Sequence, residues 1–174
     1  NLFKTGHSNE LQTNNSILLE MYSDIVNFFK KDKSYNLLDL YCGVGIISIV
    51  MSSYYNKCVG IEINQNAIDL AKYNMTNNNI SNCDFLCDRV EDIINDTTLD
   101  KIIIFVNPPR SGLYENVINK INSLKQNVIQ ILYLSCCKKT LERDLQLFDY
   151  NHQMIKEYDM FPGTEHKEYL VYLY

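Results

Sequence analysis

The chain lacks any hydrophobic run long enough to cross a lipid bilayer. Hydrophobic residues make up 46% of its 174 residues and charged residues 21%, but no apolar stretch approaches the ~20 residues that a transmembrane helix needs. A signal-peptide pattern is also missing, and the sequence opens on Asn1 rather than Met. We therefore expect a fragment or an excised domain with no membrane partner.

The sequence also lacks the residue spacings of metal sites. None of its cysteines forms a C-x-x-C pair, and no histidine joins them at zinc-finger spacing, so we expect no structural metal. Most cysteines lie inside apolar segments, which is typical of reduced thiols in a cytosol-like compartment. A cytoplasmic location is therefore expected, with an organelle as the alternative. The six cysteines are Cys42, Cys58, Cys83, Cys87, Cys136 and Cys137.

Positive charge is scarce. The 16 Lys and Arg residues are outnumbered by 21 Asp and Glu residues, which gives a formal net charge of -5 and a pI of about 5.2. This balance argues against indiscriminate binding to a polyanion. If the substrate is a nucleic acid, a local patch or a further domain must supply the affinity.

Repeats, linkers and low-complexity segments are absent, so residues 1–174 are predicted to form a single domain. Residues 1–34 are predicted to be a loop and a helix leading into it. Apolar segments then alternate with amphipathic ones, which predicts an α/β fold: a seven-stranded, mostly parallel, doubly wound sheet with an antiparallel hairpin at its end. Strands are predicted over 35–42, 57–63, 83–88, 101–109, 128–136, 152–161 and 167–174.

A glycine turn follows the first strand, in "LLDLYCGVGIIS". Gly43 and Gly45 let the backbone approach a ligand, and Glu62 ends the next strand, where an acid accepts hydrogen bonds from a ribose. Ser48 stands where a dinucleotide fingerprint has its third glycine. NAD, S-adenosylmethionine and a plain turn without a ligand are the alternatives. Asp39 just before the turn, together with the hairpin ending, favours S-adenosylmethionine.

Two further strand ends carry polar residues. Asp88 ends the third strand, where it either contacts an adenine amine or caps a helix. "NPPR", Asn107 to Arg110, ends the fourth strand, because two prolines cannot continue a central strand. We expect Asn107 to face the crevice and contact a cofactor or a base. Arg110 either meets a phosphate or caps a helix.

Two adjacent cysteines, Cys136 and Cys137, end the fifth strand and directly precede a predicted helix over 139–148. The carboxyl end of a strand is where open α/β sheets hold their functional groups. From the residues alone, a buried thiol or a strained vicinal pair is as consistent with this position as a nucleophile.

In order along the chain, these segments resemble the RNA uracil-5-methyltransferases, S-adenosylmethionine-dependent enzymes that make 5-methyluridine in tRNA and rRNA. The resemblance covers the chain nearly end to end and depends on six motifs in sequence. They are "LQTN" (11–14), "LDLYCGVG" (38–45), "GIEIN" (60–64), "NPPRSGL" (107–113), "LSCCKKTLERDL" (134–145) and "DMFPGTEHKE" (159–168).

The resemblance implies a Rossmann-like class I methyltransferase catalytic domain over 1–174, without the family's amino-terminal oligonucleotide-binding barrel. It implies an RNA substrate and S-adenosylmethionine as cofactor, and we expect a monomer. Cys136 would be the nucleophile and Glu168 the base. Four positions depart from the family pattern: Asn107 replaces Asp, Cys137-Lys138 replaces Asn-Pro, and Gly163 replaces His. The predicted cofactor-binding residues are Gln12, Tyr41, Gly43, Gly45, Ile46, Glu62, Asp88 and Asn107.

The chemistry explains why these two roles go together. Carbon 5 of uracil is a poor nucleophile until a thiolate adds to carbon 6, and a base must then remove the carbon 5 proton. The amino terminus of the helix after Cys136, with Lys138 or Lys139, is expected to favour the thiolate. Glu168 is otherwise a solvated strand acid, and His166 orients the substrate or faces solvent. An amino-methyltransferase using "NPPR" and a non-catalytic RNA-binding remnant are the alternative functions.

Overall fold

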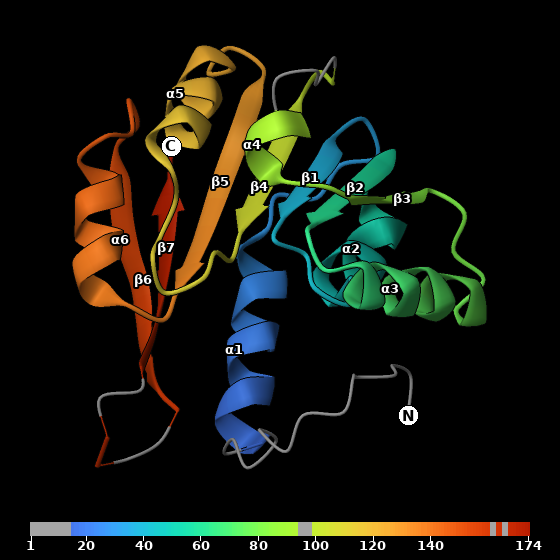
Figure 1. Ribbon diagram of the computed structural model, residues 1–174, viewed down its shortest axis with the longest axis horizontal. Helices are drawn as coiled ribbons and strands as arrows, with labels where there is room; N and C mark the ends of the chain where they lie inside the picture. The colour runs from blue at the N-terminus through green and yellow to red at the C-terminus, as the bar shows by residue number, and fades with distance from the viewer. Residues whose placement is uncertain (1–14, 94–98, 161–162, 165–166) are drawn as a thin grey trace.

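A computed structural model describes residues 15–93, 99–160, 163–164 and 167–174. Gln12 and His166, two residues of interest from the sequence, lie outside these ranges. The described chain alternates strands and helices in the predicted order (Figure 1).

Seven strands form one sheet in the order β3-β2-β1-β4-β5-β7-β6. The first five strands of the chain are mutually parallel, whereas β7 is antiparallel to both β5 and β6. The predicted mostly parallel sheet with an antiparallel ending is therefore confirmed. The strands are β1 (Asn36–Leu40), β2 (Lys57–Glu62), β3 (Cys83–Cys87), β4 (Ile102–Val106), β5 (Val128–Ser135), β6 (His152–Asp159) and β7 (Lys167–Leu173).

Helices cover both faces of this sheet. Successive strand residues point to opposite faces, so Leu37 joins one apolar core and Leu38 the other. The first core is closed by α1 (Asn15–Phe28), α2 (Ile46–Met51) and α3 (Gln65–Asn77), and the second by α4 (Val90–Ile93), α5 (Glu115–Ser123) and α6 (Lys138–Leu145). A 3₁₀ helix, η1 (Ser52–Tyr54), follows α2.

Local sequence accounts for where α3 begins and how α1 is held. The Asn64 side chain accepts hydrogen bonds from the N–H groups of Asn66 and Ala67, so it caps α3. On α1, Met21 and Ile25 lie four residues apart and are buried in the first core. Among the described residues, no helix is both long enough and apolar enough to cross a membrane.

Strand order reverses between β1 and β4. From β1 the chain winds outward to β2 and β3, and from β4 it winds the other way to β5. Because these five strands are parallel, their carboxyl ends meet at one edge of the sheet, and a crevice forms at the reversal. The loops that leave this edge are the ones that hold the residues singled out in the sequence.

Candidate active site

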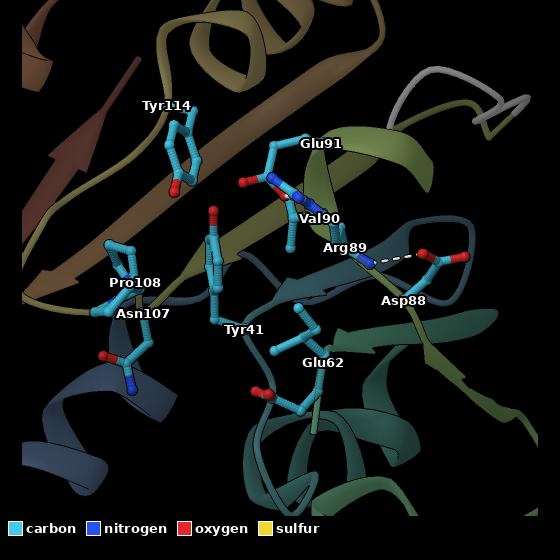
Figure 2. Close-up of a pocket in the computed structure, with 11 residues that line it drawn as sticks. Tyr41, Glu62, Asp88, Arg89, Val90, Glu91, Asn107, Pro108 and Tyr114 are labelled. Carbon is cyan, nitrogen blue, oxygen red and sulfur yellow. Dashed lines mark hydrogen bonds and ion pairs between the residues drawn. The ribbon is translucent and has the colours of Figure 1, made fainter. Parts of the chain in front are cut away.

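A pocket of about 640 Å³ lies at this edge, over the carboxyl ends of β1, β2 and β4 (Figure 2). Its volume is in the range of small-molecule sites. Four of the predicted cofactor residues, which come from the carboxyl ends of four separate strands, line it together: Tyr41, Glu62, Asp88 and Asn107.

The glycine turn and Glu62 are held to each other. The Gly43 N–H donates to Oε2 of Glu62 at 3.2 Å, and the Asn64 N–H donates to Oε1 at 2.9 Å. Both glycines have positive φ, 53° at Gly43 and 77° at Gly45. A Cβ on Gly43 would meet nothing within 4 Å, whereas one on Gly45 would lie 2.6 Å from the Phe85 ring. Gly43 therefore faces open space, and Gly45 permits close packing of the turn on β3.

Asp39 and Ser48 form a buried pair beneath the turn. Oδ2 of Asp39 accepts from the backbone N–H of Ser48 at 3.1 Å and from its hydroxyl at 2.7 Å. Burial raises the pKa of Asp39 to about 7, against the lowering effect of these bonds, and nearby Glu62 adds to the rise. The serine in place of a third glycine thus ties the start of α2 to the end of β1.

Tyr41 carries an unpaired hydroxyl into the pocket. Its backbone is in the left-handed region at φ 62°, and its hydroxyl is buried without a hydrogen-bond partner in the described chain. Burial raises its pKa above the usual value for tyrosine. A buried unpaired hydroxyl costs free energy, so this group is suited to hydrogen-bonding a ligand.

Tyr114 and Arg89 are pocket residues that the sequence analysis missed. Tyr114 projects from the loop before α5, and its hydroxyl points toward that of Tyr41 (Figure 2). No motif marks either residue. Each reaches the pocket only because β3 and β4 end beside β1 and β2.

A smaller cavity of about 160 Å³ adjoins the first across Tyr41 and Asn107, which line both. Gly43 and the predicted residue Ile46 line it on the side of the glycine turn. On its far side stands Tyr22 of α1, another residue that the sequence analysis missed. Burial raises the pKa of Tyr22, and the carboxylates of Asp39 and Glu168 add to the rise.

Cys136 and Glu168 lie side by side at the same edge. Ser135 of β5 pairs with Tyr169 of β7 in an antiparallel ladder, so the next residues outward are Cys136 on one strand and Glu168 on the other. Burial raises the pKa of the Cys136 thiol, and nearby Glu168 raises it further, whereas Arg110 lowers it.

Glu168 has one carboxylate oxygen, Oε2, that is buried without a hydrogen-bond partner in the described ranges. Burial raises the pKa of Glu168 to about 7, and the Arg110 guanidinium opposes this rise. A carboxyl with a pKa near neutral can take up or release a proton at physiological pH.

The helix amino terminus acts on a different cysteine from the one expected. Cys137, not Cys136, is the N-cap of α6. Hydrogen bonds from the side chain and backbone of Thr140 lower the pKa of Cys137, whereas that of Cys136 is raised. The expectation that the helix favours the Cys136 thiolate is therefore wrong for this state of the protein, because the thiol one residue later receives those bonds.

Arg143 and Asp144, next to each other on α6, form an ion pair, with Nε of Arg143 2.8 Å from Oδ1 of Asp144. Within the described ranges, no group of three or more His, Cys, Asp or Glu side chains could hold a metal ion.

Comparison with known proteins assigns the family. A model described as tRNA (Uracil-5-)-methyltransferase matches residues 2–174. The chain belongs to this family. Two bacterial relatives, both uncharacterized RNA methyltransferases, match 98% of the chain: that of Clostridium acetobutylicum at 36% identity and that of Mycoplasma mobile at 35%. The chain spans 38% and 47% of their lengths.

Solved structures of the family and of the wider fold agree with this assignment. The Pyrococcus abyssi tRNA (uracil-54, C5)-methyltransferase, in complex with S-adenosyl-L-homocysteine, superposes with a TM-score of 0.77 at 27% identity, over 94% of this chain and 40% of that one. A dimethyladenosine transferase from Plasmodium falciparum has a TM-score of 0.73 at 16% identity, over 88% of this chain and 60% of that one, which shows the fold alone. The Rossmann-like methyltransferase fold is thus confirmed.

Proposed function

We propose that this chain methylates carbon 5 of a uridine in tRNA or rRNA, with S-adenosylmethionine as methyl donor and with a transient covalent bond between Cys136 and the uracil ring. The observation that supports this most is the register of the β5–β7 ladder. It leaves a thiol and a carboxyl with a pKa near 7 as neighbours, at the same edge of the sheet as the pocket.

The residues of the two adjoining cavities fit S-adenosylmethionine. The unpaired Tyr41 hydroxyl, the open space over Gly43 and the fixed carboxylate of Glu62 suit a nucleoside with hydroxyl and amine groups. Asp88 and Asn107 line the larger pocket, and Ile46 lines the cavity beside it. When bound, the cofactor supplies an electrophilic methyl group on a sulfonium.

In this proposal Cys136 and Glu168 act in succession. The Cys136 sulfur adds to carbon 6 of uracil, and the electrons of the 5,6 double bond move toward the carbonyl at carbon 4, which makes carbon 5 nucleophilic. After carbon 5 has accepted the methyl group, Glu168 takes the proton from carbon 5. The bond between sulfur and carbon 6 then breaks, the double bond re-forms, and Cys136 leaves as a thiolate.

Arg110 has a supporting role in the proposed site. Its guanidinium lowers the pKa of both Cys136 and Glu168, so it favours the ionised form of each. The raised pKa of Cys136 means that the free protein holds a thiol there. Proton loss therefore accompanies addition to the ring, and Arg110 offsets part of its cost.

The experiment that tests the proposal identifies the methylated nucleoside. The purified chain is incubated with S-adenosylmethionine and, in separate arms, an unmodified tRNA transcript or an unmodified rRNA fragment. The RNA is digested to nucleosides and analysed by mass spectrometry. We expect 5-methyluridine in one arm. A methylated exocyclic amine would instead support an amino-methyltransferase, and unmodified RNA in both arms would support a non-catalytic remnant.

A further inference from the structure

The loop that follows β4, residues 107–113, is fixed to α6 by side chains that the proposed chemistry does not use. Asp144 of α6 is fully buried, and its Oδ2 accepts from the backbone N–H of Leu113 at 2.8 Å and from the Tyr133 hydroxyl at 2.7 Å. The other carboxylate oxygen accepts from Arg143. This loop runs beside α6 in Figure 1.

Arg143 extends the attachment along the loop. Its Nη2 donates to the carbonyl oxygens of Ser111 at 3.0 Å and Leu113 at 3.1 Å, while Nε and Nη2 both donate to Oδ1 of Asp144, at 2.8 and 2.5 Å. A planar guanidinium holds its donors in fixed directions, so Nε and Nη2 can face Oδ1 of Asp144 together while Nη2, which has two hydrogens, shares them among Oδ1 and the two loop carbonyls. An ammonium group cannot reproduce that arrangement.

Gly112 lets the loop approach this closely. Its φ is 75°, and a Cβ built on it would lie 2.5 Å from Oδ2 of Asp144 and 2.7 Å from Nη2 of Arg143. Hence the backbone at 112 fills the space directly over the ion pair.

Thr140 joins the same loop to the turn that carries the nucleophile. Its hydroxyl oxygen lies 3.1 Å from the carbonyl oxygen of Arg110 and 3.1 Å from that of Cys137, and its proton can be donated to either. Cys137 directly follows Cys136. The loop at the donor pocket and the turn at the nucleophile thus meet at one side chain.

We propose that Thr140, Arg143 and Asp144 are positioning residues that hold the 107–113 loop in place for the donor and in register with Cys136. The inference depends on the proposed function, since it concerns the geometry of that reaction. Asn107 and Pro109 line the donor pocket at one end of the loop, and Arg143 fixes its other end. Arg143 thereby acts on donor binding, and Thr140 on the alignment of the donor with the thiol.

The test compares Arg143→Lys and Thr140→Val with a control variant, Asn122→Ala. Asn122 ties α5 to the segment after α6 through bonds to Leu147 O at 2.8 Å and Asp149 N at 3.0 Å, and it does not line the donor pocket. S-adenosyl-L-homocysteine binding is measured by titration calorimetry, methylation by steady-state kinetics, and folding by thermal melting.

We expect Arg143→Lys to weaken S-adenosyl-L-homocysteine binding by about tenfold and to raise the donor KM with little change in kcat, since charge-assisted bonds to the loop are lost. Thr140→Val should leave donor binding unchanged and lower kcat by about tenfold, since a small misplacement of reacting groups is costly. Thr140→Ser, which keeps the hydroxyl, should restore kcat. The control should match the wild type in KM and kcat.

The outcomes separate this inference from the function on which it depends. If the wild type binds no S-adenosyl-L-homocysteine and forms no 5-methyluridine, the proposed function is wrong. If the wild type does both, while Arg143→Lys and Thr140→Val keep wild-type KM and kcat, the positioning role is wrong. The positioning role is also wrong if the activity of Arg143→Lys and Thr140→Val falls only in proportion to their melting temperatures. Any loss of activity in the Asn122→Ala control would then follow its melting temperature in the same proportion.

Discussion

At the end of β5, two neighbouring thiols have opposite electrostatic surroundings. Cys136 is half-buried beside Glu168, which keeps its pKa high, while Cys137 accepts hydrogen bonds at the start of α6, which keep its pKa low. The more acidic thiol is therefore not the one that the family motif assigns as nucleophile. Position, rather than resting ionisation, favours Cys136, because it adjoins the carboxyl that must act on the same ring.

Replacing each cysteine in turn tests this assignment. Cys136→Ala should lower methyl transfer by roughly a thousandfold or more, since no covalent bond to carbon 6 can form. Cys137→Ala should stay within roughly threefold of the wild type, because the backbone carbonyl that Thr140 contacts remains. Turnover is measured with radiolabelled methyl donor. The reverse result would assign the nucleophile to Cys137.

Glu168→Gln should stop the reaction at a later step than Cys136→Ala does. Without a base, Cys136 can still add to carbon 6 and the methyl group can still be transferred, but the carbon 5 proton stays and the cysteine cannot leave. A denaturing gel should then show protein joined to uridine-containing RNA, and the joined band should vanish when Cys136 is also replaced.

The wild type provides the control for that gel. It should form a lasting band only with 5-fluorouridine RNA, because a base cannot remove fluorine from carbon 5. Normal turnover by Glu168→Gln would mean that another group is the base. Failure to bind both donor and RNA would mean that Glu168 has a structural role.

Among the elements of the fold, the turn between β1 and α2 contains two glycines with different roles. Gly43 leaves space for a ligand, and Gly45 allows close packing. Gly43→Ala and Gly45→Ala both place a side chain at positive φ, which costs about 1–2 kcal/mol. At Gly45 the new Cβ also overlaps the Phe85 ring, at 2.6 Å, and overpacking of this kind adds about 1–3 kcal/mol.

We therefore expect Gly45→Ala to lower the free energy of unfolding by clearly more than Gly43→Ala, as measured by urea denaturation. Gly43→Ala should weaken S-adenosyl-L-homocysteine binding in calorimetry, because its methyl group enters the open space over the turn. Equal losses of stability for the two variants would mean that β3 and its Phe85 ring move aside at little cost.

The helices and strands could be predicted well from the sequence, whereas the contacts between residues of different elements could not. Period-two and helical patterns locate each strand and helix to within a few residues, and the glycine turn and Glu62 are both predicted at the carboxyl ends of neighbouring strands. Tyr22 and Tyr114 could not be found in this way. Each is an ordinary aromatic residue in its own segment and reaches the site only through the packing of α1 and the course of the loop before α5.

The same limit applies to α6. Its sequence shows an adjacent Arg143 and Asp144, which predicts a pair, but not that the pair holds a loop whose residues lie 30 positions earlier. Likewise, the position of Cys137 as N-cap depends on where β5 ends, and sequence patterns locate such boundaries only to within a few residues.

At the scale of the molecule, two carboxyl groups in the described ranges make stability depend on pH near neutrality. Asp39 and Glu168 both have a pKa of about 7 in the folded chain, raised mainly by burial, against about 4 in an unfolded chain. The folded state thus holds more protons than the unfolded state between these values. Stability must therefore fall as pH rises through that window, and the loss is complete above the folded pKa.

Two other described carboxyl groups with shifted pKa values do not oppose this trend in the same window. Asp24 has a lowered pKa, set first by its hydrogen bond from Lys156, and Asp32 has one set by bonds from Ser34. A lowered carboxyl pKa adds stability that is already present above about pH 4. These two groups change stability only in more acidic solution.

The expected result is a free energy of unfolding that decreases between about pH 5 and about pH 8, by on the order of 1 kcal/mol for each of the two groups. Because Glu168 is partly exposed, we expect its contribution to the free energy of unfolding to be smaller than that of Asp39.

Urea denaturation across this range measures the slope for the wild type, for Asp39→Asn, for Glu168→Gln and for the double variant. Each substitution removes one titrating group, so each single variant should flatten the slope in part and the double variant should remove most of it. If the double variant keeps the wild-type slope, the groups that titrate in this range lie elsewhere. The pKa of Glu168 in the folded protein would then not be near 7, as the proposed role of base requires.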